Sequence, residues 1–302
     1  MIATESVPTT GLRRAFFGPA GLRAGWRVLM FIVLMAAFEF ASGPLLNKLH
    51  ALFGEGETAG AWLVLKSILF LYVLLVVLIL GKFENRGLTD YGLPLRKIFG
   101  KDFWAGTLWG CGLLSVNFIL MAVTHAYSFG SIALSSIQII KFGSLWAAAN
   151  LMVGLAEEFV FRGYLLYWLT RGIGFWPSAI VTSALFGLTH FDVPGEPWPA
   201  VANIALLSLL LCLALQRTGN LWFAIGSHMS FDWALTFFFS VTPNTQGHLF
   251  NSSLHGSKWL TGGSAGPEGN IFNVFLVPLG ILLLAKAYPH VKYPANGRTV
   301  SD

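Results

Sequence analysis

Apolar residues along the chain form long runs that are separated by short polar segments. A helix that crosses a bilayer needs about 20 mostly apolar residues. By this criterion the sequence predicts eight spanning helices, at approximately residues 25–47, 59–81, 102–126, 143–169, 176–191, 199–216, 220–240 and 271–288. The fifth is short enough to be tilted or partly re-entrant. The pattern therefore predicts an all-α integral membrane protein.

The same pattern predicts one domain with two tails. We expect an N-terminal tail over 1–24, an eight-span domain over 25–288 and a C-terminal tail over 289–302. Composition agrees, since 55% of the residues are hydrophobic and only 11% are charged, against about 25% charged in soluble domains. An ordinary water-soluble enzyme is excluded.

The basic residues lie mostly between the apolar runs, so the formal net charge of +5 indicates membrane topology rather than nucleic-acid binding. Basic residues favour the cytoplasmic side of a membrane. With a cytoplasmic N-terminus, only Lys48, Lys141 and Lys258 fall outside, and Lys66 and Arg162 fall within spans. We therefore expect both termini in the cytoplasm. The compact layout favours the inner membrane of a bacterium.

Two further features carry less information. Cys111 and Cys212 both fall in apolar runs and are interpreted as packing residues, without a disulfide. The predicted outer loop, roughly 241–270, is rich in glycine at 261–269. Such a loop beside a membrane site is either a hinge or lid, or a flexible connector.

The first chemical motif is Glu157-Glu158 followed by Arg162. Acids inside a bilayer are costly and are usually kept for function. On a helix, Glu158 and Arg162 share a face and can pair, while Glu157 is rotated by about 100° and points elsewhere. Glu157 then remains available for a substrate or a water molecule. The alternative is a structural ion pair between helices.

Two later motifs have the same i, i+4 spacing. Phe186 precedes His190, and His228 precedes Asp232. A single histidine at a helix end is more often an interfacial residue, and Phe186 alone is more typical of packing. An acid beside a histidine can fix its tautomer, although a His–Asp pair can also simply bridge helices.

The three motifs meet only if the fourth, fifth and seventh spans are neighbours. Such a cluster could activate water by general-base catalysis and stabilise an oxyanion. Glutamate, histidine and aspartate are also zinc ligands, so a zinc site at this cluster is an open alternative. The helical zinc motif His-Glu-x-x-His is absent from the sequence.

In this order the motifs resemble the CPBP family, also called the ABI family, of CAAX-processing and bacteriocin-processing or self-immunity proteins. The resemblance covers roughly 143–240 by motif. It implies an intramembrane glutamic endopeptidase with an eight-helix core and no cofactor.

The resemblance also implies a role for each site residue. Glu157 matches the glutamate that activates water, and His190 matches the histidine that helps to hold the water. His228 and Asp232 match the pair that stabilises the oxyanion, where the family accepts Asn or Asp. Glu158 and Arg162 match the supporting acid and base. Since an ionised aspartate cannot donate to an oxyanion, we expect Asp232 to be protonated or to orient His228.

The expected substrate is a membrane-associated peptide or protein, handled in the lipid bilayer. Precursor peptides or membrane-protein tails are more plausible than prenylated proteins in a bacterium. Two alternatives of other classes remain: a non-catalytic immunity or scaffold protein that binds a peptide in the same cavity, and a proton-coupled transporter. The sequence lacks the internal repeat that many transporters show.

Overall fold

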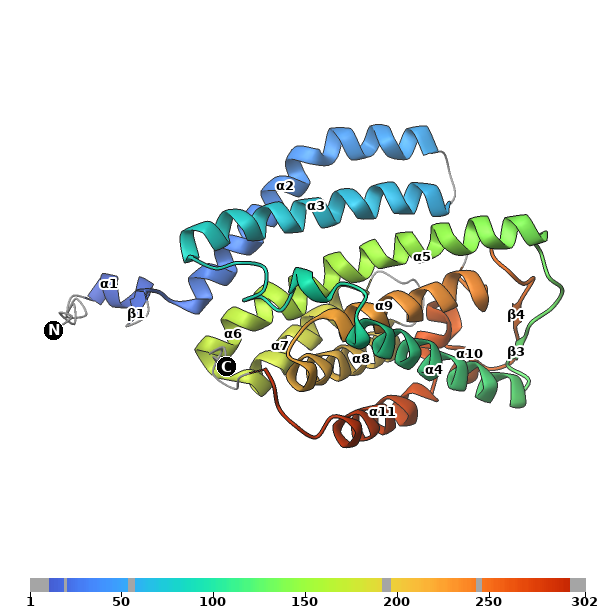
Figure 1. The fold of residues 1–302 in the computed structure, drawn as a ribbon. Helices are drawn as coiled ribbons and strands as arrows, with labels where there is room; N and C mark the ends of the chain where they lie inside the picture. The colour runs from blue at the N-terminus through green and yellow to red at the C-terminus, as the bar shows by residue number, and fades with distance from the viewer. Residues whose placement is uncertain (1–10, 19–20, 54–57, 192–196, 243–245, 294–302) are drawn as a thin grey trace.

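The computed structural model describes residues 11–18, 21–53, 58–191, 197–242 and 246–293, and its described part is almost entirely helical (Figure 1). The long helices are α2 (Ala24–Phe53), α3 (Ala59–Glu84), α4 (Lys101–Val123), α5 (Ser136–Glu158), α8 (Pro197–Thr218) and α11 (Asn273–Ala287). Shorter helices are α1 (Gly11–Phe16), α6 (Leu166–Ile173), α7 (Phe175–Leu188), α9 (Trp222–Trp233) and α10 (Lys258–Thr261). The all-α prediction is confirmed. Residues 1–10 and 294–302 of the predicted tails lie outside the described residues.

Non-α elements connect or extend these helices. Two π-helical segments, η2 (Phe159–Leu165) and η3 (Ala234–Phe238), continue α5 and α9, and two 3₁₀ segments are η1 (Leu95–Lys97) and η4 (Gly263–Gly269). The strands are two-residue pairs, β1 (Phe17–Gly18) with β2 (Gly21–Leu22), and β3 (Tyr127–Ser128) with β4 (Ser253–Leu254). They tie loops together and do not form a core.

Six helical stretches in the described residues are long and apolar enough to cross a membrane, so the protein is a multi-pass membrane protein. The predicted count of eight is not confirmed. The fifth predicted span is the 14-residue α7, about 21 Å long against about 30 Å of hydrocarbon. The seventh is α9 with η3, which have 12 and 5 residues.

Successive helices nevertheless run alternately between two ends of the molecule. At one end, the Leu221 N–H donates to the Gly92 carbonyl, and the Lys292 N–H donates to the Gln216 carbonyl. These bonds place the α3–α4 loop, the α8–α9 turn and the segment after α11 together. The β3–β4 pair lies at the opposite end (Figure 1).

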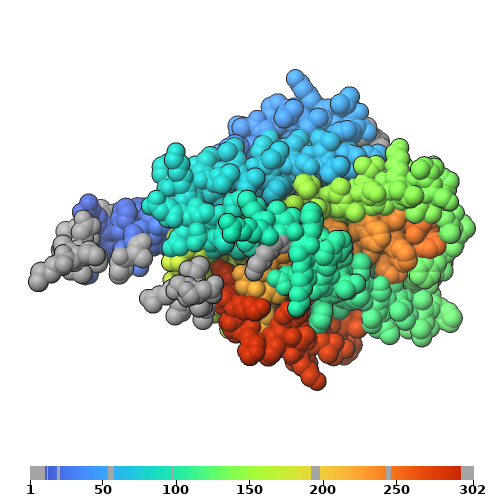
Figure 2. Space-filling model, in the orientation of Figure 1, coloured from blue at the N-terminus to red at the C-terminus, as the bar shows by residue number. Residues whose placement is uncertain are grey.

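Helix α9 lies in the middle of the bundle because glycines let α4 approach its backbone. A Cβ atom at Gly106 would lie 2.0 Å from the Phe223 carbonyl oxygen, and one at Gly110 would lie 2.1 Å from that of Ser227. Small residues four apart allow such contacts between membrane helices. In the space-filling view, α9 shows as an orange patch between the greens of α4 and α5 (Figure 2).

A buried carboxylate fixes the segment that follows α5. Glu84, at the end of α3, pairs with Arg27 at 3.1 Å and accepts hydrogen bonds from Tyr91, from Tyr164 in η2 at 2.8 Å and from Trp168 in α6 at 3.1 Å. Burial, together with the bond to Glu84, raises the pKa of Tyr91, so its hydroxyl stays a donor. This cluster joins α2 and α3 to the helix that carries the first motif.

The Gly-rich segment forms short helical turns that contact α8 and α11. Residues 258–269 form α10 and η4. Buried amides hold this region: Asn117 donates to Asn273 at 2.7 Å, and Asn270 donates to Asn117 at 2.7 Å. Asn203 of α8 donates to the Asn270 carbonyl at 3.1 Å. The Gly-rich segment is therefore an ordered part of the bundle.

Candidate active site

The first motif ends α5, immediately before the π-helical segment η2. The Arg162 Nη1 atom donates to the Glu158 Oε1 atom at 2.9 Å, and both side chains are fully buried. The predicted pair of Glu158 with Arg162 is confirmed. Because Arg162 is a fixed charge without access to water, Glu158 is compensated within the protein.

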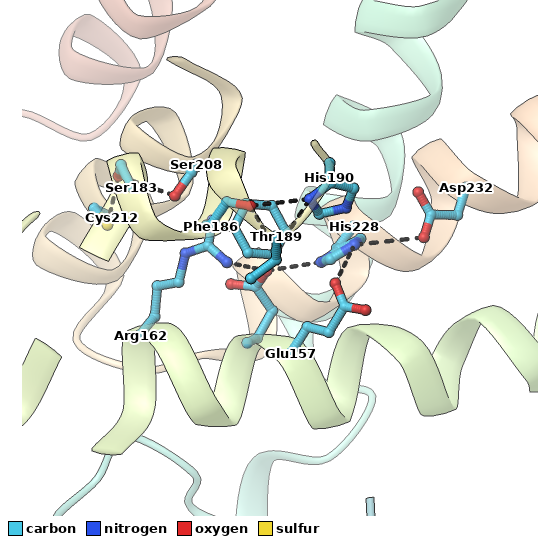
Figure 3. Close-up of polar contacts among 11 residues, drawn as sticks. Glu157, Arg162, Ser183, Phe186, Thr189, His190, Ser208, Cys212, His228 and Asp232 are labelled. Atoms are coloured by element: carbon cyan, nitrogen blue, oxygen red, sulfur yellow. Dashed lines mark hydrogen bonds and ion pairs between the residues drawn. The ribbon is translucent and has the colours of Figure 1, made fainter. Parts of the chain in front are cut away.

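His228 of α9 is surrounded by three carboxylates (Figure 3). Its Nδ1 atom lies 2.8 Å from Glu158 Oε1, whereas its Nε2 atom lies 3.4 Å from Asp232 Oδ2 and 3.7 Å from Glu157 Oε2. A carboxylate accepts, so Nδ1–H donates to Glu158. The Nε2 atom then faces the remaining two acids.

Glu157 and Glu158 point in different directions, as the helical spacing predicts, and they lie beside opposite nitrogens of one imidazole. Asp232 lies 3.4 Å from the Nε2 atom, and the expectation that it is protonated or orients His228 stays a prediction. Glu158 holds the ring at Nδ1, a contact that the sequence did not predict, because α5 and α9 pack closely at Gly154, where a Cβ would lie 3.2 Å from the Ile225 carbonyl.

Phe186 of α7 is the contact that joins the three motifs. The Arg162 guanidinium carbon lies 4.3 Å from the centre of its ring, a cation–π contact. The rings of His190 and His228 lie 4.9 and 5.9 Å from it. Phe186 is buried, and its ring packs against Arg162 and both imidazoles.

His190 lies just after α7 ends at Leu188, and its ring is held by its own helix. Its Nδ1 atom lies 2.9 Å from the Phe186 carbonyl oxygen, so Nδ1–H donates and Nε2 keeps a free lone pair. The Thr189 hydroxyl donates to the same carbonyl at 2.7 Å. Because α7 ends early, the Nε2 atom of His190 is an oriented hydrogen-bond acceptor that lies within the bundle.

The three motifs open on one cavity of about 480 Å³, which Glu157, His190, His228 and Asp232 line together. The predicted convergence of three separate apolar segments is therefore confirmed. Glu158 and Arg162 lie behind the cavity wall and do not line it.

The cavity also has polar residues that sequence reasoning did not assign to the site: Lys66, Asn150, Thr236 and Glu268. Asn150 lies seven residues, or two helical turns, before Glu157 on α5, so helical periodicity could have indicated it. Lys66 is a charged residue in an apolar span, but the sequence pattern does not assign it a role. Nothing local in the sequence points to Glu268.

A metal site is not apparent from the geometry. Over the described ranges, no three or more His, Cys, Asp or Glu residues are arranged to hold a metal ion. Zinc at this cluster stays a hypothesis for metal analysis.

Comparison with known families identifies the region that contains the site. The family model "Type II CAAX prenyl endopeptidase Rce1-like" matches residues 139–234. We refer to these residues as the Rce1-like segment. The segment runs from α5 to the start of η3 and contains all six predicted site residues. The resemblance to CAAX proteases is confirmed, and the match implies a CAAX-type intramembrane protease.

Comparisons with curated proteins and with solved structures found no match. The Rce1-like segment covers about a third of the chain, and Lys66 and Glu268 lie outside it.

Proposed function

We propose that the protein is a glutamic endopeptidase that hydrolyses a peptide bond of a membrane-associated peptide or protein. The observation that carries this proposal is the cavity in which Glu157, His190 and His228 face a common space inside an apolar bundle. Amide hydrolysis needs a base for water and a donor for the oxyanion, and these side chains can supply both.

Glu157 is the proposed general base. It lines the cavity, and its Oε2 atom accepts no hydrogen bond within the described part of the chain, so the carboxylate can accept one from water. The water's second hydrogen bond can go to the free Nε2 atom of His190. As the water oxygen attacks the carbonyl carbon, Glu157 takes its proton, and it returns this proton to the nitrogen when the C–N bond breaks. The products are a carboxylic acid and an amine.

His228 is the proposed donor to the oxyanion. Glu158 holds Nδ1–H, and the two acids beside Nε2 favour a proton on that atom as well. An imidazolium at this place donates from Nε2 to the developing negative charge. Arg162 acts as a positioning residue, because it fixes Glu158 and through it the histidine ring.

Substitution of the base tests this function. Purified protein in detergent is assayed on a quenched-fluorescent peptide library, and Glu157→Gln is expected to lower kcat/KM by about 100-fold or more. Glu39→Gln is the matched control, since Glu39 is also an acid in a predicted span but lines a different cavity, between α2 and α3. It should cleave like the unchanged protein.

Other outcomes separate the alternatives. Undiminished cleavage by a folded Glu157→Gln variant rejects Glu157 as the base. Loss of cleavage on chelation, restored by zinc, supports the zinc alternative. A phenotype that survives Glu157→Gln supports an immunity or scaffold role, and substrate flux in proteoliposomes supports a transporter.

A further inference from the structure

Glu268 brings an additional acid into the cavity from outside the Rce1-like segment. It lies in η4 and lines the same space as Glu157, His228 and Asp232. Its backbone carbonyl accepts from the side-chain amides of Asn203 at 2.8 Å and of Asn273 at 3.2 Å. Residues from α8 and α11 thus fix the position from which this carboxylate enters the cavity.

The carboxylate of Glu268 has no direct bonding partner in the described part of the protein. Within the described ranges it has neither a hydrogen bond nor an ion pair. His228 acts on it electrostatically, but this imidazole already lies beside Glu158, Asp232 and Glu157. Lys66 lines the cavity, but its ammonium lies 5.0 Å from the ring centre of Trp62, and no ion pair joins it to an acid in the described residues.

Asn150 gives independent evidence that the cavity receives a hydrogen-bond donor. It is fully buried, and its Nδ2 atom donates to Thr236 Oγ1 at 3.2 Å. The Thr236 hydroxyl donates to the Asp232 carbonyl at 2.7 Å, which confirms the amide orientation. The Asn150 Oδ1 atom is therefore an acceptor, and it has no partner among the described residues.

Three unpartnered groups of the cavity are thus acceptors, namely Asn150 Oδ1, Glu157 Oε2 and the Glu268 carboxylate, while Lys66 is a donor. An occupant rich in N–H donors and positively charged satisfies them best. Ten of the other lining residues are apolar, and five of these are leucines, so the cavity also fits apolar side chains. A peptide with a lysine or arginine among apolar residues has this combination.

We propose that Glu268 is a specificity-determining residue that binds a lysine or arginine side chain of the peptide substrate near the bond that is cut. This inference rests on the proposed function. It adds a substrate class, namely basic-apolar peptides, and it assigns part of the recognition to the Gly-rich segment.

The test uses peptides that differ at one position only, with Lys, Arg, Gln or Glu. For the unchanged protein, kcat/KM with Lys or Arg should exceed that with Gln by about tenfold or more, as for a hydrogen bond to a charged group. Glu268→Gln should bring this ratio close to one, and Glu268→Lys should favour the Glu peptide. Glu39→Gln should keep the original preference. Equal loss of rate on all peptides in Glu268→Gln would overturn the proposal.

A binding measurement separates this proposal from the hydrolase itself. Fluorescence anisotropy compares Lys and Gln peptides on Glu157→Gln and on Glu157→Gln/Glu268→Gln. A Lys preference only in the first protein supports the role of Glu268 even if no peptide is cut. Cleavage without any charge preference keeps the hydrolase and rejects the role of Glu268.

A third measurement needs no variant of Glu268. Lysine amide should inhibit cleavage by the unchanged protein more strongly than norleucine amide, which has the same chain length without the ammonium group. Equal inhibition would contradict the proposal, whether or not the Glu268 variants fold.

Discussion

His228 is the residue whose surroundings decide how the site can work. One nitrogen is 2.8 Å from Glu158, and the other faces Asp232 and Glu157 at 3.4 and 3.7 Å. Because Glu158 is itself fixed by Arg162 at 2.9 Å, these two residues hold the ring at Nδ1. Asp232 lies beside Nε2, where its charge acts on that nitrogen.

We predict that Asp232→Asn retains substantial activity, with kcat/KM within about tenfold of the unchanged protein. The amide keeps an acceptor beside His228 Nε2 and adds a donor that can reach an oxyanion. Steady-state cleavage of one reference peptide checks this. His228→Asn serves as the comparison, and it should lose about 100-fold or more as an oxyanion donor is removed. Near-complete inactivity of a folded Asp232→Asn protein would show that the carboxylate is needed.

The local pairs of the site could be predicted, because i and i+4 residues share a helix face. This rule gave Glu158 with Arg162 and His228 with Asp232. The contact of Glu158 with His228 joins residues 70 apart in the chain, and no local rule places it. Glu268 is more remote still, since its position depends on amides from other helices.

At the scale of elements, the approach of α4 to α9 sets the position of His228. Gly106 and Gly110 face the α9 backbone, and in return a Cβ at Gly226 would lie 2.2 Å from the Phe103 carbonyl oxygen. Contacts this short leave no room for any side chain, so the two helices are locked at a fixed distance.

We predict that Gly106→Ala destabilises the protein by roughly 1–3 kcal/mol, the usual cost of overpacking a core. The new Cβ would lie 2.0 Å from the Phe223 carbonyl oxygen, so α9 has to move. Gly112→Ala is the matched control on the same helix, since a Cβ there meets nothing within 4 Å. Thermal unfolding in detergent compares the two. A Gly106→Ala protein as stable as Gly112→Ala would show that the interface can adjust.

The π-helical turns are the elements that the sequence did not predict. One begins at Phe159, directly after the glutamate pair, and the other begins at Ala234, two residues after Asp232. Such turns are frequent at functional sites. Apolar content identifies a span but does not distinguish α from π bonding, so only the helices themselves were predictable. The same limit applies to α7, whose early end at Leu188 places His190 inside the bundle.

At the scale of the whole molecule, the ends of the helices agree with the charge pattern of the sequence. At one face of the molecule the α3–α4 loop, the α8–α9 turn and the segment after α11 meet. Basic residues at or after helix ends lie at this face: Arg86, Arg96, Arg171, Arg217 and Lys292. The positive-inside rule predicts that this face is cytoplasmic. The β3–β4 pair would then lie outside, which gives an even number of crossings.

Cysteine labelling of intact cells tests this topology. In a background with Cys111 and Cys212 replaced by alanine, single cysteines are introduced at the exposed positions Arg96, Ser131 and His290. A membrane-impermeant maleimide should label only the Ser131→Cys protein, because Ser131 lies beside β3, on the other side of the membrane from Arg96 and His290. Permeabilised cells should label all three, which shows that each cysteine is reactive.

If His290→Cys is labelled in intact cells, the number of crossings after Ser131 is even. In that case either α7 or the α9–η3 helix does not cross the membrane. Both are short for a crossing, because α7 has 14 residues, and α9 and η3 have 12 and 5.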